Sequence, residues 1–161
     1  MKRVALSAAT LVTAGALGFA AFALVRSDDS GERCFTQQGE TAISACTKAI
    51  QSGRFSGPAL AGIYDNRAIE LRQQGEFDRA IADYTAAIRI DAELTGAYTG
   101  RGLAWEGKAD AEKAKADYRM ALTLEQKYAD GAWAHETARG RLEALGEFSA
   151  STSSRTDGSG S

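Results

Sequence analysis

The chain has 161 residues, and its 19 Lys and Arg against 21 Asp and Glu leave a net charge of −2 at neutral pH. This mildly acidic balance lacks the basic surface that binds nucleic acid, so we expect no nucleic-acid partner. A chain of this length suffices for one hydrophobic core and leaves no room for a second domain.

The N-terminus has the pattern of an export segment. Lys2 and Arg3 precede a stretch without charges from residue 4 to residue 25. We expect residues 1–25 to be either a signal peptide, cleaved after the small-x-small motif Ala21–Ala23, or an uncleaved membrane anchor. Because positive charges stay on the cytoplasmic side, both topologies export the rest of the chain. The expected location is periplasmic or exported, or anchored in the inner membrane with the folded domain outside the cytoplasm.

Both cysteines fall in a short helical hairpin over about residues 32–52. Residues 37–40 copy residues 73–76, which predicts a turn at residues 39–40. Cys34 and Cys46 then lie at matching heights on antiparallel helices, so we expect a disulfide between them. Closing this short loop stabilises a fold by about 3 kcal/mol in the chain-entropy model. Two buried free thiols are the alternative interpretation.

The loop that follows contains the only proline of the chain. Pro58 suits the first turn of the next helix, where its missing N–H is not needed. Phe55 either packs over the first hairpin or stays free.

The middle of the chain repeats itself. The nine residues Ala80–Ile88 recur as Ala114–Leu122, 34 positions later, and a related copy, Ala42–Ile50, lies upstream. A period of this size indicates a repeat architecture in which stacked neighbours bury each other's apolar faces. Gly75 separates the two helices of one unit. We therefore expect helix pairs over about 61–94 and 95–128, preceded by the partial unit at about 32–52.

The large and small residues of these units resemble the tetratricopeptide repeat pattern. The first unit reads Tyr64-x2-Arg67-Ala68-x2-Leu71 and then Ala80-x3-Tyr84, and the second reads Tyr98-x2-Arg101-Gly102-x2-Trp105 and then Ala114-x3-Tyr118. Arg replaces the usual Leu twice, and neither unit has the closing Pro. The resemblance covers about residues 32–145. It implies an all-α fold, a short solenoid of antiparallel helix pairs with a C-terminal capping helix.

The resemblance also implies a concave groove lined by the first helix of each unit. The positions that correspond to this groove are Asp65, Asn66, Ile69, Arg72 and Gln73 in the first unit, and Thr99, Gly100, Leu103, Glu106 and Gly107 in the second. The family's clamp for a C-terminal carboxylate is matched only by Asn66. Because the acidic Asp65 would repel a carboxylate, we do not transfer that chaperone-tail function.

The C-terminal part is expected to end the solenoid. Residues 129–145 predict a capping helix in which Trp133 corresponds to Tyr98. Residues 146–161 are rich in Ser, Thr and Gly without apolar periodicity, which is typical of a disordered tail.

The sequence offers little chemistry for catalysis. His135 is the only histidine, and its neighbour Glu136 points elsewhere on a helix, so they form neither a catalytic pair nor a metal site. There is no Gly-rich phosphate loop, and we expect the carboxylates of Glu70, Asp83 and Asp117 to lie on solvated faces. The chain is therefore not expected to be an enzyme or to need a cofactor or metal.

The remaining function is binding. We expect a non-catalytic adaptor or scaffold of the bacterial cell envelope that binds a peptide or helix of another protein in its groove. The alternatives are a self-associating structural component of the envelope, joined through the end helix or the groove, and an accessory subunit of an envelope enzyme.

Overall fold

The computed structural model describes residues 29–147, so the N-terminal segment and the tail from residue 148 lie outside the described residues. Helices joined by short turns account for this part, and it contains no β-strand. The helices are α2 (Ser30–Thr36), α3 (Gly39–Gln51), α4 (Gly57–Gln73), α5 (Phe77–Ile90), α6 (Thr95–Gly107), α7 (Ala111–Thr123) and α8 (Gly131–Ala144).

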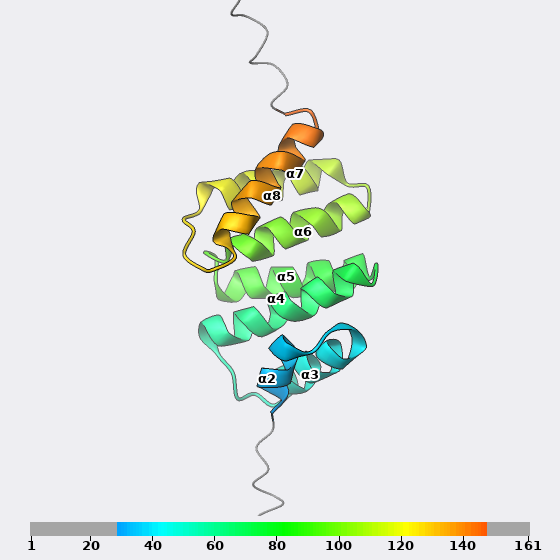
Figure 1. Cartoon of the computed structure of the whole chain (residues 1–161), viewed down its shortest axis with the longest axis vertical. Helices are drawn as coiled ribbons and strands as arrows, with labels where there is room; N and C mark the ends of the chain where they lie inside the picture. Colours follow the sequence, from blue (N-terminus) through cyan, green and yellow to red (C-terminus); the bar gives the residue numbers. More distant parts are fainter. Residues whose placement is uncertain (1–28, 148–161) are drawn as a thin grey trace, which may run out of the picture.

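The helices stack as antiparallel pairs, as Figure 1 shows from α2 and α3 at one end to α8 at the other. The first helices of successive pairs contact one another, α2 with α4, α4 with α6 and α6 with α8. Each second helix packs against its own partner and against the first helix of the next pair. This arrangement confirms the all-helical solenoid that the repeat predicts, and it places α4, α6 and α8 in one layer.

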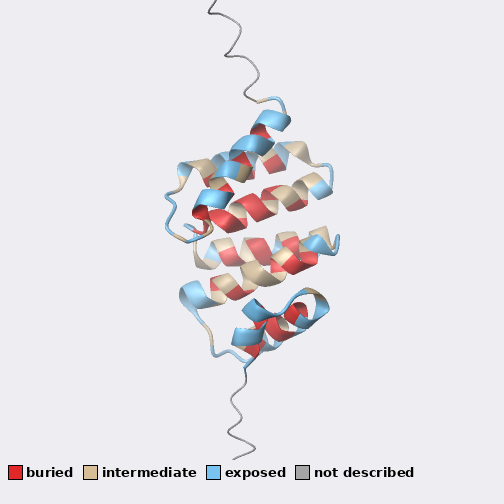
Figure 2. Cartoon of the chain, viewed as in Figure 1, coloured by how far each residue is buried: buried red, intermediate tan, exposed pale blue. Residues whose placement is uncertain are grey.

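Small residues let the helices approach closely around two tyrosines. Tyr84 and Tyr118 are fully buried and belong to the repeated segments. A Cβ added to Gly100 would lie 2.5 Å from the Tyr84 ring, and one added to Gly102 would lie 2.5 Å from the Tyr118 ring. Each ring therefore fills the space above a glycine of α6, and a larger residue there would push the helices apart. Figure 2 shows the resulting core as the inward faces of the helices.

The turn at Gly75 follows the prediction, whereas the equivalent turn at Ala109 and the turn of the first hairpin differ from it. Gly75 ends α4 in the left-handed region at a φ of 79°. At the equivalent point of the next unit, Ala109 takes a φ of 60° without being a glycine. The first hairpin turns at residues 37–38, earlier than the expected residues 39–40, because Gly39 already begins α3.

The two ends of the described region are held by local contacts. Pro58 lies in the first turn of α4, as predicted, and Phe55 packs against the first hairpin rather than staying free. At the other end, Gly146 adopts a φ of 83° and Glu147 donates its backbone N–H to Leu142 O at 3.0 Å. These two residues, assigned to the tail by composition, close α8 instead, and Glu147 also pairs with Arg119.

Candidate partner-binding groove

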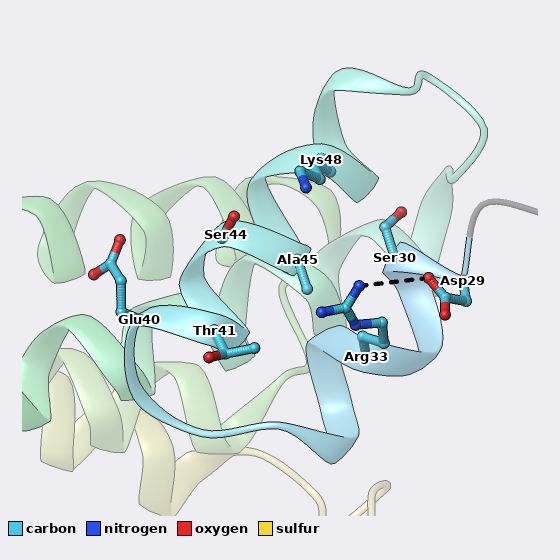
Figure 3. Close-up of a pocket in the computed structure, with 8 residues that line it drawn as sticks. All are labelled: Asp29, Ser30, Arg33, Glu40, Thr41, Ser44, Ala45 and Lys48. Carbon is cyan, nitrogen blue, oxygen red and sulfur yellow. Dashed lines mark ion pairs between the residues drawn. The ribbon is translucent and has the colours of Figure 1, made fainter.

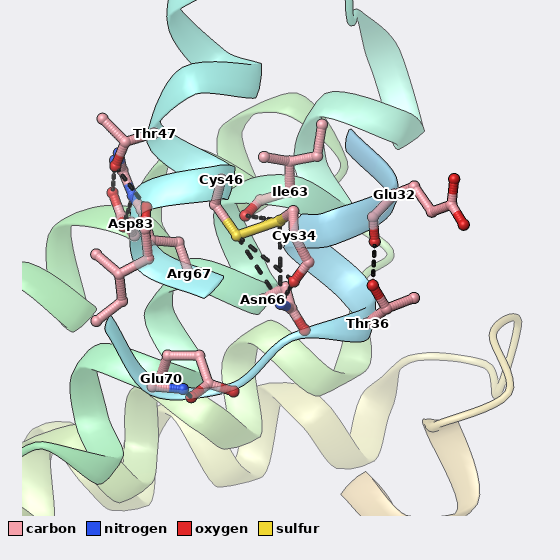
Figure 4. Close-up of a disulfide and its surroundings, with 12 residues drawn as sticks. Glu32, Cys34, Thr36, Cys46, Thr47, Ile63, Asn66, Arg67, Glu70 and Asp83 are labelled. Atoms are coloured by element: carbon pink, nitrogen blue, oxygen red, sulfur yellow. Dashed lines mark hydrogen bonds and ion pairs between the residues drawn. A yellow bond between two sulfur atoms is a disulfide. The ribbon is translucent and has the colours of Figure 1, made fainter. Parts of the chain in front are cut away.

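The disulfide joins the two helices of the first hairpin, and Asn66 connects this hairpin to α4. Cys34 and Cys46 are bonded and fully buried, with their Cα atoms 4.6 Å apart, as the hairpin geometry predicts. The side-chain amide of Asn66 donates to the backbone oxygen of Cys34 (Figure 4). Asn66, a predicted groove residue, therefore joins α4 to α2.

A cavity of about 320 Å³ lies where α4, α5, α6 and the start of α8 meet. Four of the predicted groove residues on α4 and one on α6 contribute to it. Its lining consists of Asp65, Ile69, Arg72, Gln73, Tyr84, Gly96, Gly100, Asp130 and Trp133. The cavity thus joins apolar and charged side chains from helices that are distant in sequence.

The predicted groove positions further along α6 are covered by α8. Thr99 is fully buried and its hydroxyl donates to Ala134 O at 3.2 Å. Leu103 packs against the cluster that contains Leu142. Glu106 is paired with Arg141, whose hydrogen bond holds the pKa of Glu106 below its ordinary value.

Gly107, the last predicted groove residue on α6, lies against the ring of Phe77. The structure therefore brings four of the five predicted α4 positions together with Gly100 in one hollow and separates them from Asn66 and from the other predicted positions of α6.

Electrostatics in the cavity centre on Asp65. Its Oδ1 is buried and accepts no hydrogen bond within residues 29–147. The pKa of Asp65 is raised to about 7, chiefly by burial and also by the nearby Asp130, while Arg72 acts in the opposite direction. The Nε of Arg72 donates to the hydroxyl of Tyr84 at 3.5 Å. Burial also raises the pKa of Tyr84, which keeps this phenol neutral.

Four residues of the cavity lie outside the predicted groove positions, namely Tyr84, Gly96, Asp130 and Trp133. Trp133 was aligned with Tyr98 in the sequence; it is 49% exposed and lines the cavity. Trp133 lies 34 positions, one repeat length, after the predicted groove residue Thr99. Alignment by repeat length, instead of alignment of Trp133 with the aromatic Tyr98, therefore places Trp133 on the groove side of its helix. Asp130 lies just before α8, and its carboxylate occupies the space beside the Gly96 backbone. No repeat pattern marks this residue as acidic, because its equivalent 34 positions earlier is Gly96.

A second hollow lies between α2 and α3 (Figure 3). It is lined mainly by polar and charged side chains, and Arg33, Glu40 and Lys48 are among the charged ones. Its ion pair between Arg33 and Asp29 spans 3.9 Å with both side chains about half exposed, so water screens it.

Comparison with known proteins identifies the fold. No protein-family profile matches the chain, and no curated protein matches it. Among solved structures, the TPR domain of OM64 from Arabidopsis is 30% identical, and the match covers 70% of this chain and 91% of that domain, with a TM-score of 0.55. The chain belongs to the tetratricopeptide repeat family. Its fold is that of a protein–protein interaction module, which is typically non-catalytic.

Each full tetratricopeptide repeat unit contains a shielded ion pair that joins its own two helices. Arg67 binds Asp83 through Nε and Nη2 at 2.7 and 2.8 Å, and Arg101 binds Asp117 in the same way. The remaining guanidinium nitrogen of each Arg donates to a Thr of the preceding unit, at 3.0 Å to Thr47 and 3.1 Å to Thr85. Each Arg thus connects two units where the repeat pattern has Leu.

These pairs correct the expectation that the carboxylates are solvated. Asp83, Asp117 and Glu70 are each only 7% exposed. Glu70 accepts the backbone N–H of Gly39 at 2.6 Å and so satisfies a free donor at the start of α3. The repeat of both Arg and Asp at 34 residues was the signal in the sequence that could have revealed the ion pairs.

Three further observations concern the tetratricopeptide repeat domain. Within residues 29–147, no group of three or more His, Cys, Asp or Glu is placed to hold a metal ion. His135 lies on α8, where its Nδ1 is 3.1 Å from the Gln126 amide nitrogen. In the same range, no helix is long and apolar enough to cross a membrane.

Proposed function

We propose that this protein is an adaptor of the bacterial cell envelope and that it binds a peptide of another protein in the cavity between α4, α6 and α8. The observation that carries the proposal is the lining of this cavity. Ile69 and Trp133 offer apolar surface, while Asp65, Arg72 and Gln73 offer groups that form hydrogen bonds. Binding sites combine apolar walls with a few polar groups in this way.

The size of the cavity favours a short extended segment over a long helix. Because α8 lies over Thr99 and pairs with Glu106, the open part of the groove is confined to the α4 side. A hollow of about 320 Å³ admits one or two side chains, which anchor an extended peptide while its backbone stays near the rim. Such a contact is smaller than a stable protein interface, so we expect fast, reversible binding.

The envelope location rests on the N-terminal pattern and on the cysteines. The positive start followed by an uncharged stretch is typical of exported chains. The buried disulfide between Cys34 and Cys46 fits an oxidising compartment, because cytosolic thiols are kept reduced.

Photocrosslinking tests the proposed groove in cells that express the full chain. A photoreactive residue is placed at Gln73, on the rim of the cavity, and separately at Glu112 on α7, where the side chain is 82% exposed. We expect a crosslinked partner from position 73 only, and its loss when Ile69→Glu is added.

A matched control separates the groove from general damage to the fold. Ile69 and Ile81 are both partly buried and pack against the same core, but only Ile69 lines the cavity. Ile81→Glu should therefore leave capture intact at a comparable melting temperature. Capture that survives Ile69→Glu, or that is equal from positions 73 and 112, would place the interaction on another surface.

A further inference from the structure

The cavity carries more negative than positive charge. Asp65 and Asp130 line it together with Arg72, which directs its Nε to the Tyr84 hydroxyl. Within residues 29–147, neither of these two carboxylates forms an ion pair with a Lys or Arg. A single guanidinium therefore faces two acidic side chains, and the imbalance disfavours an anionic ligand.

One buried oxygen of the Asp65 carboxylate lacks a hydrogen-bond partner among the described residues. The atom is Oδ1, and burial without a hydrogen bond is costly for a charged oxygen. Asp130 approaches from the other side of the cavity, against the backbone of Gly96. Burial and this second carboxylate both raise the pKa of Asp65, to about 7. A cation placed between the two carboxylates would relieve both effects.

The apolar part of the lining suits the stem of a long cationic side chain. Trp133 presents an indole ring that is 49% exposed, and Ile69 lies in the same lining. Elsewhere in the chain a cation stacks on an indole, since Lys113 Nζ lies 4.3 Å from the centre of the Trp105 ring. Among the described residues, no cation stacks on Trp133 in this way. The face of a Trp ring attracts an ammonium or guanidinium group.

We propose that the cavity binds a Lys or Arg side chain of the partner peptide, with the cationic group between Asp65 and Asp130 and the methylene stem against Ile69 and Trp133. This assignment rests on the proposed function, because it names the residue type that the groove selects. Arg72 then holds Tyr84 in place rather than binding a peptide carboxylate.

Peptide titrations followed by NMR test this selection on the ¹⁵N-labelled full chain. The probes are four blocked pentapeptides, Ac-Ala-Leu-X-Leu-Ala-NH₂, in which X is Lys, Arg, norleucine or Glu. We expect the Lys and Arg peptides to shift the backbone signals of Gly96 and Gly100 and the indole signal of Trp133. Norleucine keeps the stem without the charge, so its peptide should bind at least about tenfold more weakly. The Glu peptide should bind most weakly.

Variants separate the carboxylates from the rest of the groove. Asp65→Asn with Asp130→Asn should make the Lys and norleucine peptides bind equally. The control, Asp78→Asn with Glu112→Gln, removes two exposed negative charges elsewhere and should keep the preference. Between pH 6 and pH 8 the Lys peptide should bind about tenfold more tightly, because Asp65 loses its proton, and Asp65→Asn should remove this dependence. Asp130, Arg72 and Tyr84 are the other titratable groups that act on Asp65.

The outcomes distinguish this selection from the proposed function. Equal binding of the Lys and norleucine peptides to the unmodified chain would overturn the selection while leaving the groove as a binding site. Shifts confined to residues outside the cavity would overturn it as well. Crosslinking from Gln73 that fails together with every peptide titration would overturn the proposed function itself.

Discussion

The ion pair between Arg101 and Asp117 offers a quantitative test of how the repeats hold together. Two hydrogen bonds of 2.8 and 2.7 Å join the side chains, which are only 19% and 9% exposed. A pair this well shielded differs from surface pairs, which contribute about 0–1 kcal/mol. Removing one partner of a buried pair costs about 3–5 kcal/mol, because the other charge is left without compensation.

We therefore expect Arg101→Leu to lower the free energy of unfolding by about 3 kcal/mol, since it leaves the carboxylate of Asp117 buried alone. Asp117→Ala should cost less, about 2 kcal/mol, because the guanidinium keeps Thr85 as an acceptor and is partly hydrated. The double variant should lose much less than the sum, because both buried charges are gone and Leu is the residue of the family pattern at this position. The coupling energy is then at least about 2 kcal/mol.

Urea denaturation of the four proteins in this cycle measures these values directly. The pair between Arg119 and Glu147 serves as a control, because the Arg119 side chain is 53% exposed and Arg119→Leu should cost under about 1 kcal/mol. Additive single and double variants, or single losses no larger than that of Arg119→Leu, would refute the view that the shielded ion pair stabilises its helix pair.

Three further predictions concern stability. Cys46→Ala should lower the free energy of unfolding by about 3 kcal/mol. Hydrogen exchange should become faster mainly before residue 58, because each unit depends chiefly on its neighbours. Equally faster exchange along the whole chain would contradict this. The pKa of Asp65, raised to about 7, means that the folded state retains a proton that the unfolded chain releases, so stability falls as pH rises from about 4 to 7. Asp65→Asn should remove this fall and gain up to about 4 kcal/mol at pH 7, and an unchanged pH profile of melting temperature would argue against it. Ala109→Gly should stabilise the folded state by about 0.5–1 kcal/mol because Ala109 has a positive φ, whereas Gly75→Ala should destabilise it. Calorimetry that finds stability changes of the same sign for both variants would contradict the turn geometry.

The local structure could be predicted from the sequence because it depends on residues close together in the chain. The copies at Ala80–Ile88 and Ala114–Leu122 carry the spacing of apolar residues that makes each helix amphipathic, and Gly75 marks the end of one. The pairing of Cys34 with Cys46 could be predicted for the same reason, since both lie in one hairpin whose turn is copied from the next unit. The family followed from these spacings together.

The groove depended on contacts between helices, which no local spacing contains. The repeat does not indicate where α8 lies on α6, because residues 124–130 share no identity with residues 90–96, their equivalents 34 positions earlier. That placement covers Thr99, brings Asp130 beside Asp65, and leaves Trp133 at the cavity rather than in the core. Periodicity assigns a residue to one face of its own helix. Only the packing of the tertiary structure decides whether that face meets water, a carboxylate or another helix. This packing sets how deeply each ionisable side chain is buried and therefore its state of protonation.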